Sequence, residues 1–490
     1  MKAKIARGAV WLIMARGGSS LIALCSTLVL ARLLAPADFG LVALATTMLA
    51  ILSAVTEMSL ASALVNHPNP TEEHFNTAWS LNMARALLIG LIFCAASYPA
   101  ARIYHEPRLA GVMIVLGLTM TMNGASNPKM ITFSRNLVFK QDFALNLSSK
   151  VAGFVTALVV ALIYRSYWAL VAGSVAIEVT MITVSYCILP YRPRLTWRHA
   201  RELWSFSVWL TLSQAVNTIN FKSDQFLIGS FVGRIPLGFY AVGDNLAATV
   251  TREATAPLTQ TLFPAFTALR TDRARLRQAY GSAQKTVSAI SLPIGIGTAL
   301  VADPLVRLVM GEKWLPAVIA IQVLSCVFGL QTIGSLVQPL ALALGETKRL
   351  FTRDVLNFLI RFPTILAGLL LAGWHGVVYA RLLSGGVAIV INLWLVRELV
   401  GLSMQEQVRG NFRALASVAV MAAVVATVGR GYDVPAHPSG QIEVLARLVG
   451  IGFMTYVTTS WLLWRLAGRP DGAERIASIS IQRLTSRLRA

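Results

Sequence analysis

Long apolar stretches separated by short polar segments run through the whole sequence. A helix that spans a membrane needs roughly 20 predominantly apolar residues, and about fourteen stretches reach that length. They cover approximately residues 9–33, 40–65, 77–100, 108–127, 143–164, 167–189, 204–231, 237–265, 283–309, 315–343, 353–373, 376–397, 411–429 and 442–466. This pattern predicts an all-α polytopic membrane protein with about 14 transmembrane helices.

Basic residues concentrate in alternate connections between these stretches. If the N-terminus lies in the cytoplasm, most of the loop arginines and lysines fall on the cytoplasmic side, as the positive-inside rule requires. The acidic connection from His67 to His74 is the exception. The charge pattern therefore predicts a multi-pass protein with both termini in the cytoplasm and no extramembrane domain.

The composition agrees with a membrane protein and changes the meaning of the net charge. The chain is 56% hydrophobic and 13% charged, with a net charge of +21. In a soluble protein this excess would favour nucleic acid as a partner, but here the basic residues form short clusters between apolar runs, so topology explains them. Each of the four cysteines lies in an apolar run, and no zinc-ligand spacing or P-loop is present. We therefore expect no nucleic-acid partner, metal or cofactor.

An internal repeat divides the chain. The segment Leu33–Leu44 aligns with Phe231–Val242, which places Gly40 on Gly238. Two further matches follow in the same order, between His105–Val115 and Gly311–Ile321 and between Phe139–Asp142 and Phe351–Asp354. Parallel repeats around a central site are a transporter architecture. We predict two six-helix bundles in parallel repeat around a central cavity, at residues 1–190 and 191–402, and an additional helix pair with a basic cytoplasmic tail at 403–490.

Ionisable residues also fall within the predicted spans, where a charge at the bilayer centre costs about 2.5–3.5 kcal/mol. The cations are Arg16, Arg85, Lys150, Lys222, Arg252, Arg361 and Arg381, and the anions are Glu57, Glu178, Asp224 and Glu253. A cavity with surplus positive charge fits an anionic cargo, and guanidinium groups bind phosphate in a bidentate manner. Candidate substrate-binding residues are therefore Arg16, Arg252, Lys222, Arg85, Arg361 and Arg381.

A structural role remains open for several of these charges. Lys150, Arg85 and Arg381 are near enough to the predicted helix ends to reach the membrane surface. Lys222 and Asp224 are about 200° apart around a helix, so they do not pair with each other. Each could instead pair across helices and only stabilise the bundle.

The sequence resembles the bacterial polysaccharide transporters of the Wzx/WzxC type, in the multidrug/oligosaccharidyl-lipid/polysaccharide exporter superfamily. The resemblance extends from about Gly8 to about Leu402 and rests on SFVGRIPLGFYAVGDNLA, TLFPAFTALRTDRARLRQAYGSA, GEKWLPAV and STLVLARLLAPADFGLVALA.

The resemblance implies a flippase of the bacterial inner membrane that moves undecaprenyl-pyrophosphate-linked oligosaccharides to the periplasmic leaflet by alternating access. It also implies functional arginines in the first and eighth helices, where Arg16 and Arg252 lie. Its expected partners are the lipid-linked oligosaccharide, membrane lipids, a polysaccharide polymerase and export machinery. Candidates for binding a coupling ion are Glu57, Asp224, Glu178 and Glu253.

Two other functions are alternatives to a flippase for exopolysaccharide or lipopolysaccharide synthesis. One is a cation-coupled multidrug exporter of the related branch, whose cavity would favour acidic residues. The other is an enzyme, a polysaccharide polymerase or ligase, which needs a long periplasmic loop with catalytic groups. The longest predicted outside connection runs only from Gly429 to Gln441, so we expect no enzymatic activity.

Overall fold

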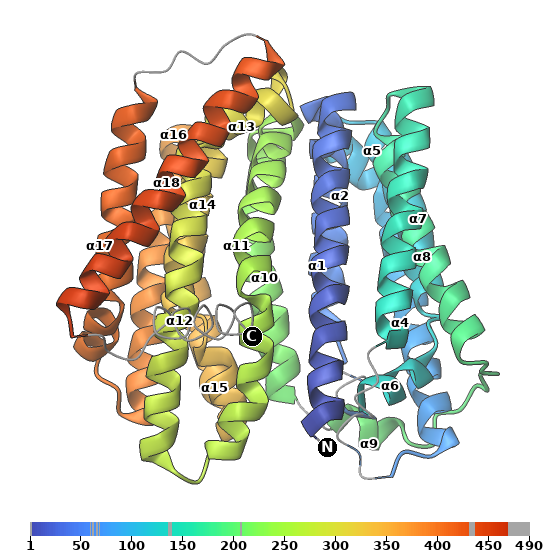
Figure 1. The fold of residues 1–490 in the computed structure, drawn as a ribbon. Helices are drawn as coiled ribbons and strands as arrows, with labels where there is room; N and C mark the ends of the chain where they lie inside the picture. The colour runs from blue at the N-terminus through green and yellow to red at the C-terminus, as the bar shows by residue number, and fades with distance from the viewer. Residues whose placement is uncertain are drawn as a thin grey trace, which may run out of the picture. The chain divides into compact units, whose positions relative to one another are not determined.

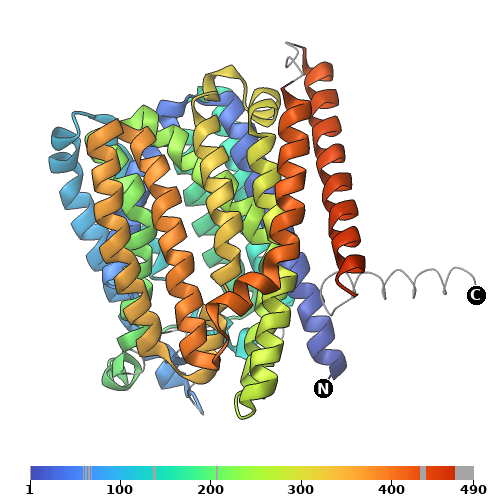
Figure 2. The same cartoon turned by 90° about the vertical axis from the view of Figure 1, so that its left-hand side faces the viewer.

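The computed structural model describes the backbone of residues 2–58, 60, 63–64, 67, 69–135, 140–205, 208–430 and 437–468. Side chains are described for these residues except 2–16, 134–135, 203–205, 208–210, 252–254 and 256–261. Every regular element in this part of the chain is a helix (Figures 1 and 2). Inter-residue contacts divide the chain into two compact units.

Unit 1 comprises Met1–Val242 and Ala372–Trp374. Its helices are α1 (Lys2–Leu33), α2 (Pro36–Val55), α4 (Glu72–Ile103), α5 (Arg108–Asn123), α6 (Ile131–Arg135), α7 (Lys140–Tyr164), α8 (Trp168–Ile188), α9 (Ala200–Ser205) and α10 (Val208–Phe231), followed by the start of α11 (Arg234–Leu269). The helix α7 packs against α1 and α8, while α2 packs against α10 and α5. The helices of unit 1 thus pack both with their neighbours along the chain, as α7 does with α8, and with helices far away in the sequence, as α1 does with α7.

Unit 2 comprises Gly243–Leu371 and His375–Ala490. After α11 it contains α12 (Arg273–Leu300), α13 (Ala302–Val309), α14 (Ala317–Gln331), α15 (Val337–Leu344), α16 (Thr347–Val400), α17 (Met404–Gly429) and α18 (Pro438–Leu466). The helix α17 packs against both α12 and α18, which run side by side with it in Figure 2. The chain bends by 67° between α12 and α13.

The helix α16 is interrupted near its middle. Ala372 and Gly373 have non-helical backbone angles, and Gly373 adopts a positive φ of 60°. Glycine has no Cβ, so it enters this region at little cost. Gly368, before this break, packs directly on the Gly376 carbonyl after it. The element is therefore a hairpin of two helices, which matches the two spans predicted at 353–373 and 376–397.

The all-α membrane class predicted from the hydrophobic pattern is confirmed, and each predicted stretch overlaps a helix. Among the described residues, eight helices are long and apolar enough to cross a membrane, or nine if α12 and α13 form one bent span. One of the eight is the hairpin α16, which holds two predicted spans. The described apolar part of α1 and the whole of α5 are shorter than the spanning length. The number of about 14 spans stays a prediction.

The two glycines that the repeat aligns meet in unit 1, where the first turns of α2 and α11 cross. A Cβ added to Gly40 would overlap the Arg234 carbonyl, and one added to Gly238 would overlap the Pro36 carbonyl. Pro36 and Arg234 are the first residues of the two helices and are also aligned by the repeat. The contact is thus reciprocal, as in an interface with two-fold symmetry. Only glycine permits this backbone approach.

We predict that Gly40→Ala and Gly238→Ala each destabilise the protein by about 3 kcal/mol, the upper end of the cost of overpacking. The clash is with backbone, which yields less readily than a side-chain end. Thermal unfolding of the purified variants in detergent measures the effect. The control is Gly386→Ala on α16, where an added Cβ meets nothing within 4 Å. The melting temperature of that variant should equal or exceed that of the parent. Equal melting temperatures for all three variants would contradict the close contact between α2 and α11.

Candidate functional site

Two charged residues predicted separately from the sequence lie together in unit 1. Arg85 on α4 pairs with Glu57, which follows the end of α2, with 2.9 Å between Nη2 and Oε2. The same nitrogen donates to the Ser53 carbonyl in the last turn of α2, also at 2.9 Å. A helix C-terminus carries partial negative charge and stabilises a cation. Glu57 and the end of α2 therefore compensate the Arg85 charge, and the pair links α2 to α4.

A second polar cluster joins α2, α10 and the start of α11. Asp224 on α10 is only 1% exposed and accepts a hydrogen bond from the Tyr240 hydroxyl at 2.7 Å. The next residue, Gln225, accepts through Oε1 from Lys222 Nζ at 3.1 Å and from the Thr47 hydroxyl of α2 at 2.9 Å. Buried polar groups are stable when they are hydrogen-bonded in this way. Tyr240 was not predicted as part of a site, since its position within an apolar repeat segment gives no sign of this contact.

The remaining predicted charges of unit 1 whose side chains are described lie on α7 and α8. Glu178 on α8 is half-buried and accepts a hydrogen bond from Asn123 Nδ2 of α5 at 2.9 Å. Lys150 is half-buried on α7, and no described side chain forms an ion pair or hydrogen bond with it. Glu178 therefore contributes to helix packing within unit 1 through a neutral partner.

Unit 2 buries two arginines, one in each arm of the α16 hairpin. Arg361 is 7% exposed and Arg381 is 1% exposed. The Arg381 guanidinium carbon lies 5.6 Å from the centre of the Phe328 ring, a cation–π arrangement. Its proximity to a predicted helix end had left open whether Arg381 reaches the membrane surface. The side chain instead points into the protein. Arg381 is the most deeply buried of the described candidate cations.

An ion pair near the start of α16 was not predicted. Arg353 Nη2 lies 2.6 Å from Asp354 Oδ1; the Asp354 side chain is buried and that of Arg353 is 12% exposed. The repeat aligns Asp354 with Asp142, but this alignment does not indicate the ion pair. The side chains of Arg16, Arg252 and Glu253 lie outside the described residues, so their positions stay predictions.

Three ligand-type side chains meet in unit 1 at the connection before α4. The nitrogen or oxygen ligand atoms of His67, His74 and Glu202 all lie within 4.8 Å of one another. However, Nδ1 of His67 accepts from the Asn69 backbone N–H, and Nδ1 of His74 accepts from the Thr71 backbone N–H, each at 3.2 Å. A backbone N–H can only donate, so in the neutral rings the proton sits on Nε2. Each Nε2 therefore donates toward Glu202 and has no free electron pair for a metal.

His199 completes this cluster, which sequence patterns do not reveal because its members are far apart along the chain. The His199 ring stacks on His74 with 3.9 Å between centroids, and its Nδ1 lies 3.1 Å from Glu202 Oε2. Hydrogen bonds from His199 and then His67 hold the pKa of Glu202 below its usual range. The arrangement is a carboxylate bound by imidazoles, and it fixes α9 against α4.

Comparisons with characterised proteins agree with this architecture. The succinoglycan biosynthesis transport protein ExoT of Rhizobium meliloti is 24% identical over 71% of this chain and 71% of its own length. The lipopolysaccharide biosynthesis protein WzxC of Escherichia coli is 22% identical over 83% and 84%, respectively. The teichuronic acid biosynthesis protein TuaB of Bacillus subtilis is 23% identical over 82% and 84%. Each aligns with most of this chain.

Solved structures show the same fold at low identity. The lipid II flippase MurJ in an inward closed conformation superposes with a TM-score of 0.74, at 13% identity, over 93% of this chain and 99% of MurJ. An inward-facing multidrug MATE transporter gives a TM-score of 0.56, at 13% identity, over 81% and 95%. The profile of the polysaccharide biosynthesis protein family matches residues 29–319. The chain therefore belongs to the polysaccharide biosynthesis protein family, as the sequence resemblance indicated.

Proposed function

We propose that the protein flips undecaprenyl-pyrophosphate-linked oligosaccharides across the inner membrane for exopolysaccharide or lipopolysaccharide synthesis. Family membership and the likeness to transport proteins of polysaccharide synthesis support this function and the absence of catalysis. The observation that carries it is Arg381, a guanidinium held within the membrane-spanning part of the chain. A pyrophosphate offers the charge and the bidentate geometry that a guanidinium binds best.

The proposed mechanism is alternating access. The pyrophosphate would meet cations within the protein, among which we include Arg361, Arg381 and Lys222, together with Arg16 and Arg252. Arg85 fits this role less well, since Glu57 already compensates its charge. We further propose that residues 1–190 and 191–402 act as the two moving lobes, with both termini in the cytoplasm. A polysaccharide polymerase and export machinery would receive the flipped repeat units.

A cation-coupled multidrug exporter is the second candidate. The likeness to MATE transporters and the fully buried Asp224 carboxylate favour it. In the flippase proposal, Asp224, Glu57, Glu178 and Glu253 are candidates for binding a coupling ion instead. The two functions differ in what the cations do, because a cavity for cationic drugs gains nothing from buried arginines.

We expect Arg381→Gln to lower flipping by at least about tenfold, since hydrogen bonds to charged groups contribute about 1.5–3 kcal/mol. Arg381→Lys should retain part of the activity, because it keeps the charge without the planar fork. The measurement is the amount of lipid-linked repeat unit that stays in the cytoplasmic leaflet of a deletion strain carrying each variant. Arg397→Gln, an exposed site on the same helix, is the control. Full activity of Arg381→Gln at normal protein levels would refute the assignment.

We expect Asp224→Asn to leave resistance to cationic drugs unchanged and to lower flipping several-fold in cells with an intact ion gradient. The amide keeps the size of the side chain and still accepts from the Tyr240 hydroxyl but carries no charge. Drug susceptibility and polymer output of overexpressing strains measure both effects. Tyr240→Phe, which keeps the carboxylate, should have the smaller effect on flipping. Drug resistance that depends on Asp224 but not on Arg381 would favour the exporter.

A further inference from the structure

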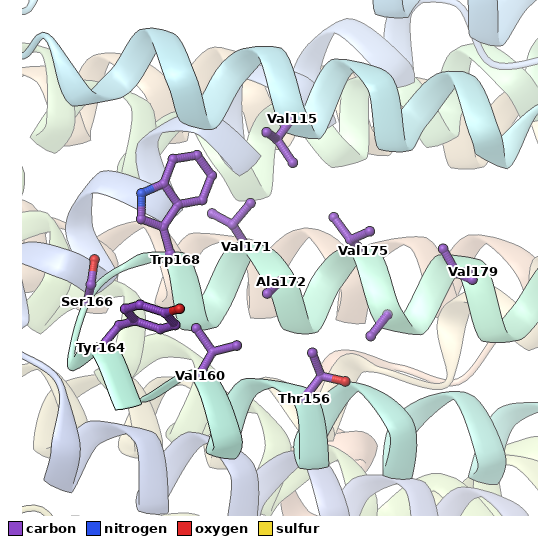
Figure 3. Close-up of a pocket in the computed structure, with 11 residues that line it drawn as sticks. Val115, Thr156, Val160, Tyr164, Ser166, Trp168, Val171, Ala172, Val175 and Val179 are labelled. Carbon is purple, nitrogen blue, oxygen red and sulfur yellow. The ribbon is translucent and has the colours of Figure 1, made fainter. Parts of the chain in front are cut away.

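An apolar groove lies between α5, α7 and α8 of unit 1 (Figure 3). Its volume is about 700 Å³. The walls consist of Val115, Thr156, Val160, Val171, Ala172, Val175, Ala176 and Val179, and one end is formed by Tyr164, Ser166 and Trp168. Most of the wall is hydrocarbon, and apart from the Thr156 hydroxyl on α7 the polar side-chain atoms of the lining belong to Tyr164, Ser166 and Trp168 at one end (Figure 3). The groove is thus mainly apolar along its length and most polar at that end, like a lipid.

The helix α8 builds the groove by its spacing. Val171, Val175 and Val179 are four residues apart, so they lie along one face of the helix. Ala172 and Ala176 lie next to them and leave space that larger side chains would fill. Pockets of about 300–1,000 Å³ hold ligands the size of a drug molecule. A volume of this order accommodates a single acyl chain better than a long polyprenyl carrier.

The polar end lies at the turn between α7 and α8. Figure 3 shows Tyr164 and Trp168 together at one end of the row of valines. Tyr164 is 70% exposed and Trp168 is 38% exposed, although both are large and aromatic. Tyrosine and tryptophan with this exposure are typical of the membrane–water interface. The turn therefore marks the level of the lipid headgroups.

The turn between α7 and α8 carries a positively charged residue, Arg165. Arg165, between Tyr164 and Ser166, is exposed, and no described carboxylate pairs with it. Its φ of 46° places it in the left-handed region, which fixes the sharp turn. The contrast is Arg108 at the start of α5, which already pairs with Glu106 at 3.0 Å. The positive charge of Arg165 is therefore available to pair with an anionic group of a ligand.

We propose that this groove binds an anionic phospholipid, with one acyl chain along the valines of α8 and the phosphate against Arg165. The hydrocarbon walls select a lipid chain, and the aromatic pair sets its depth. The uncompensated charge of Arg165 favours an anionic headgroup over a zwitterionic one. The site is separate from the buried arginines of α16 and does not depend on the proposed flipping function.

The experiment is native mass spectrometry of the full-length protein, purified with equal amounts of phosphatidylglycerol and phosphatidylcholine of the same chains. We expect the parent to retain phosphatidylglycerol preferentially. Arg165→Asn should lower that preference about fivefold, as expected for loss of one cation near a membrane surface. Asparagine tolerates a left-handed backbone, so the turn should persist. Ala176→Phe should fill the groove and lower retention of both lipids.

Two controls match these variants. Arg201→Asn removes an exposed arginine of unit 1 at the α9 segment. Val159→Phe enlarges a 48% exposed side chain on α7 that does not line the groove. Both should behave as the parent. Equal retention of the two phospholipids by the parent, or an unchanged preference in Arg165→Asn, would overturn the proposal. In a matched purification with undecaprenyl phosphate in place of phosphatidylcholine, preferential retention of undecaprenyl phosphate would overturn the proposal and assign the groove to a polyprenyl chain.

Discussion

A charge in the hydrocarbon of a membrane costs about 2.5–3.5 kcal/mol even on lenient scales. Two of the described charged residues show how partners on neighbouring helices reduce this cost. Arg85 is compensated by Glu57 and by the carbonyl end of α2. Asp224 is held by the Tyr240 hydroxyl. In each case the partner comes from a neighbouring helix, so the polar contact also fixes which helices lie side by side.

Association of the helices also requires close packing of their backbones, which depends on small residues. Membrane helices associate without a hydrophobic driving force between them, so contacts at short range count for more. The crossing of α2 and α11 at Gly40 and Gly238 is such a contact. The alignment of these glycines in the sequence repeat and their reciprocal contact in unit 1 have one explanation, a local two-fold relation between the repeated segments.

The sequence was informative where one residue type or period decides the structure. Hydrophobic length predicted the helices, and the helix break at Ala372 and Gly373 agrees with two predicted spans. Contacts between distant residues were not predictable in this way. Nothing in the local pattern indicates that His67, His74 and His199 all contact Glu202, or that Tyr240 binds Asp224. Burial of Arg381 was likewise undecided, since its distance from a helix end allowed either position.

Stability alone does not account for the deeply buried charges. Replacing a buried ion pair with apolar residues of similar size is often neutral or stabilising, by about 1–4 kcal/mol. By the same reasoning, helix packing alone does not require a charge at Arg381 or Asp224. What such side chains lack is a site for charge within the membrane. A protein that moves a pyrophosphate needs cations there, and one that couples this movement to an ion needs a carboxylate. Arg381 and Asp224, whose burial costs free energy, are thus residues that the proposed function requires. The Arg85–Glu57 pair instead fits a structural role.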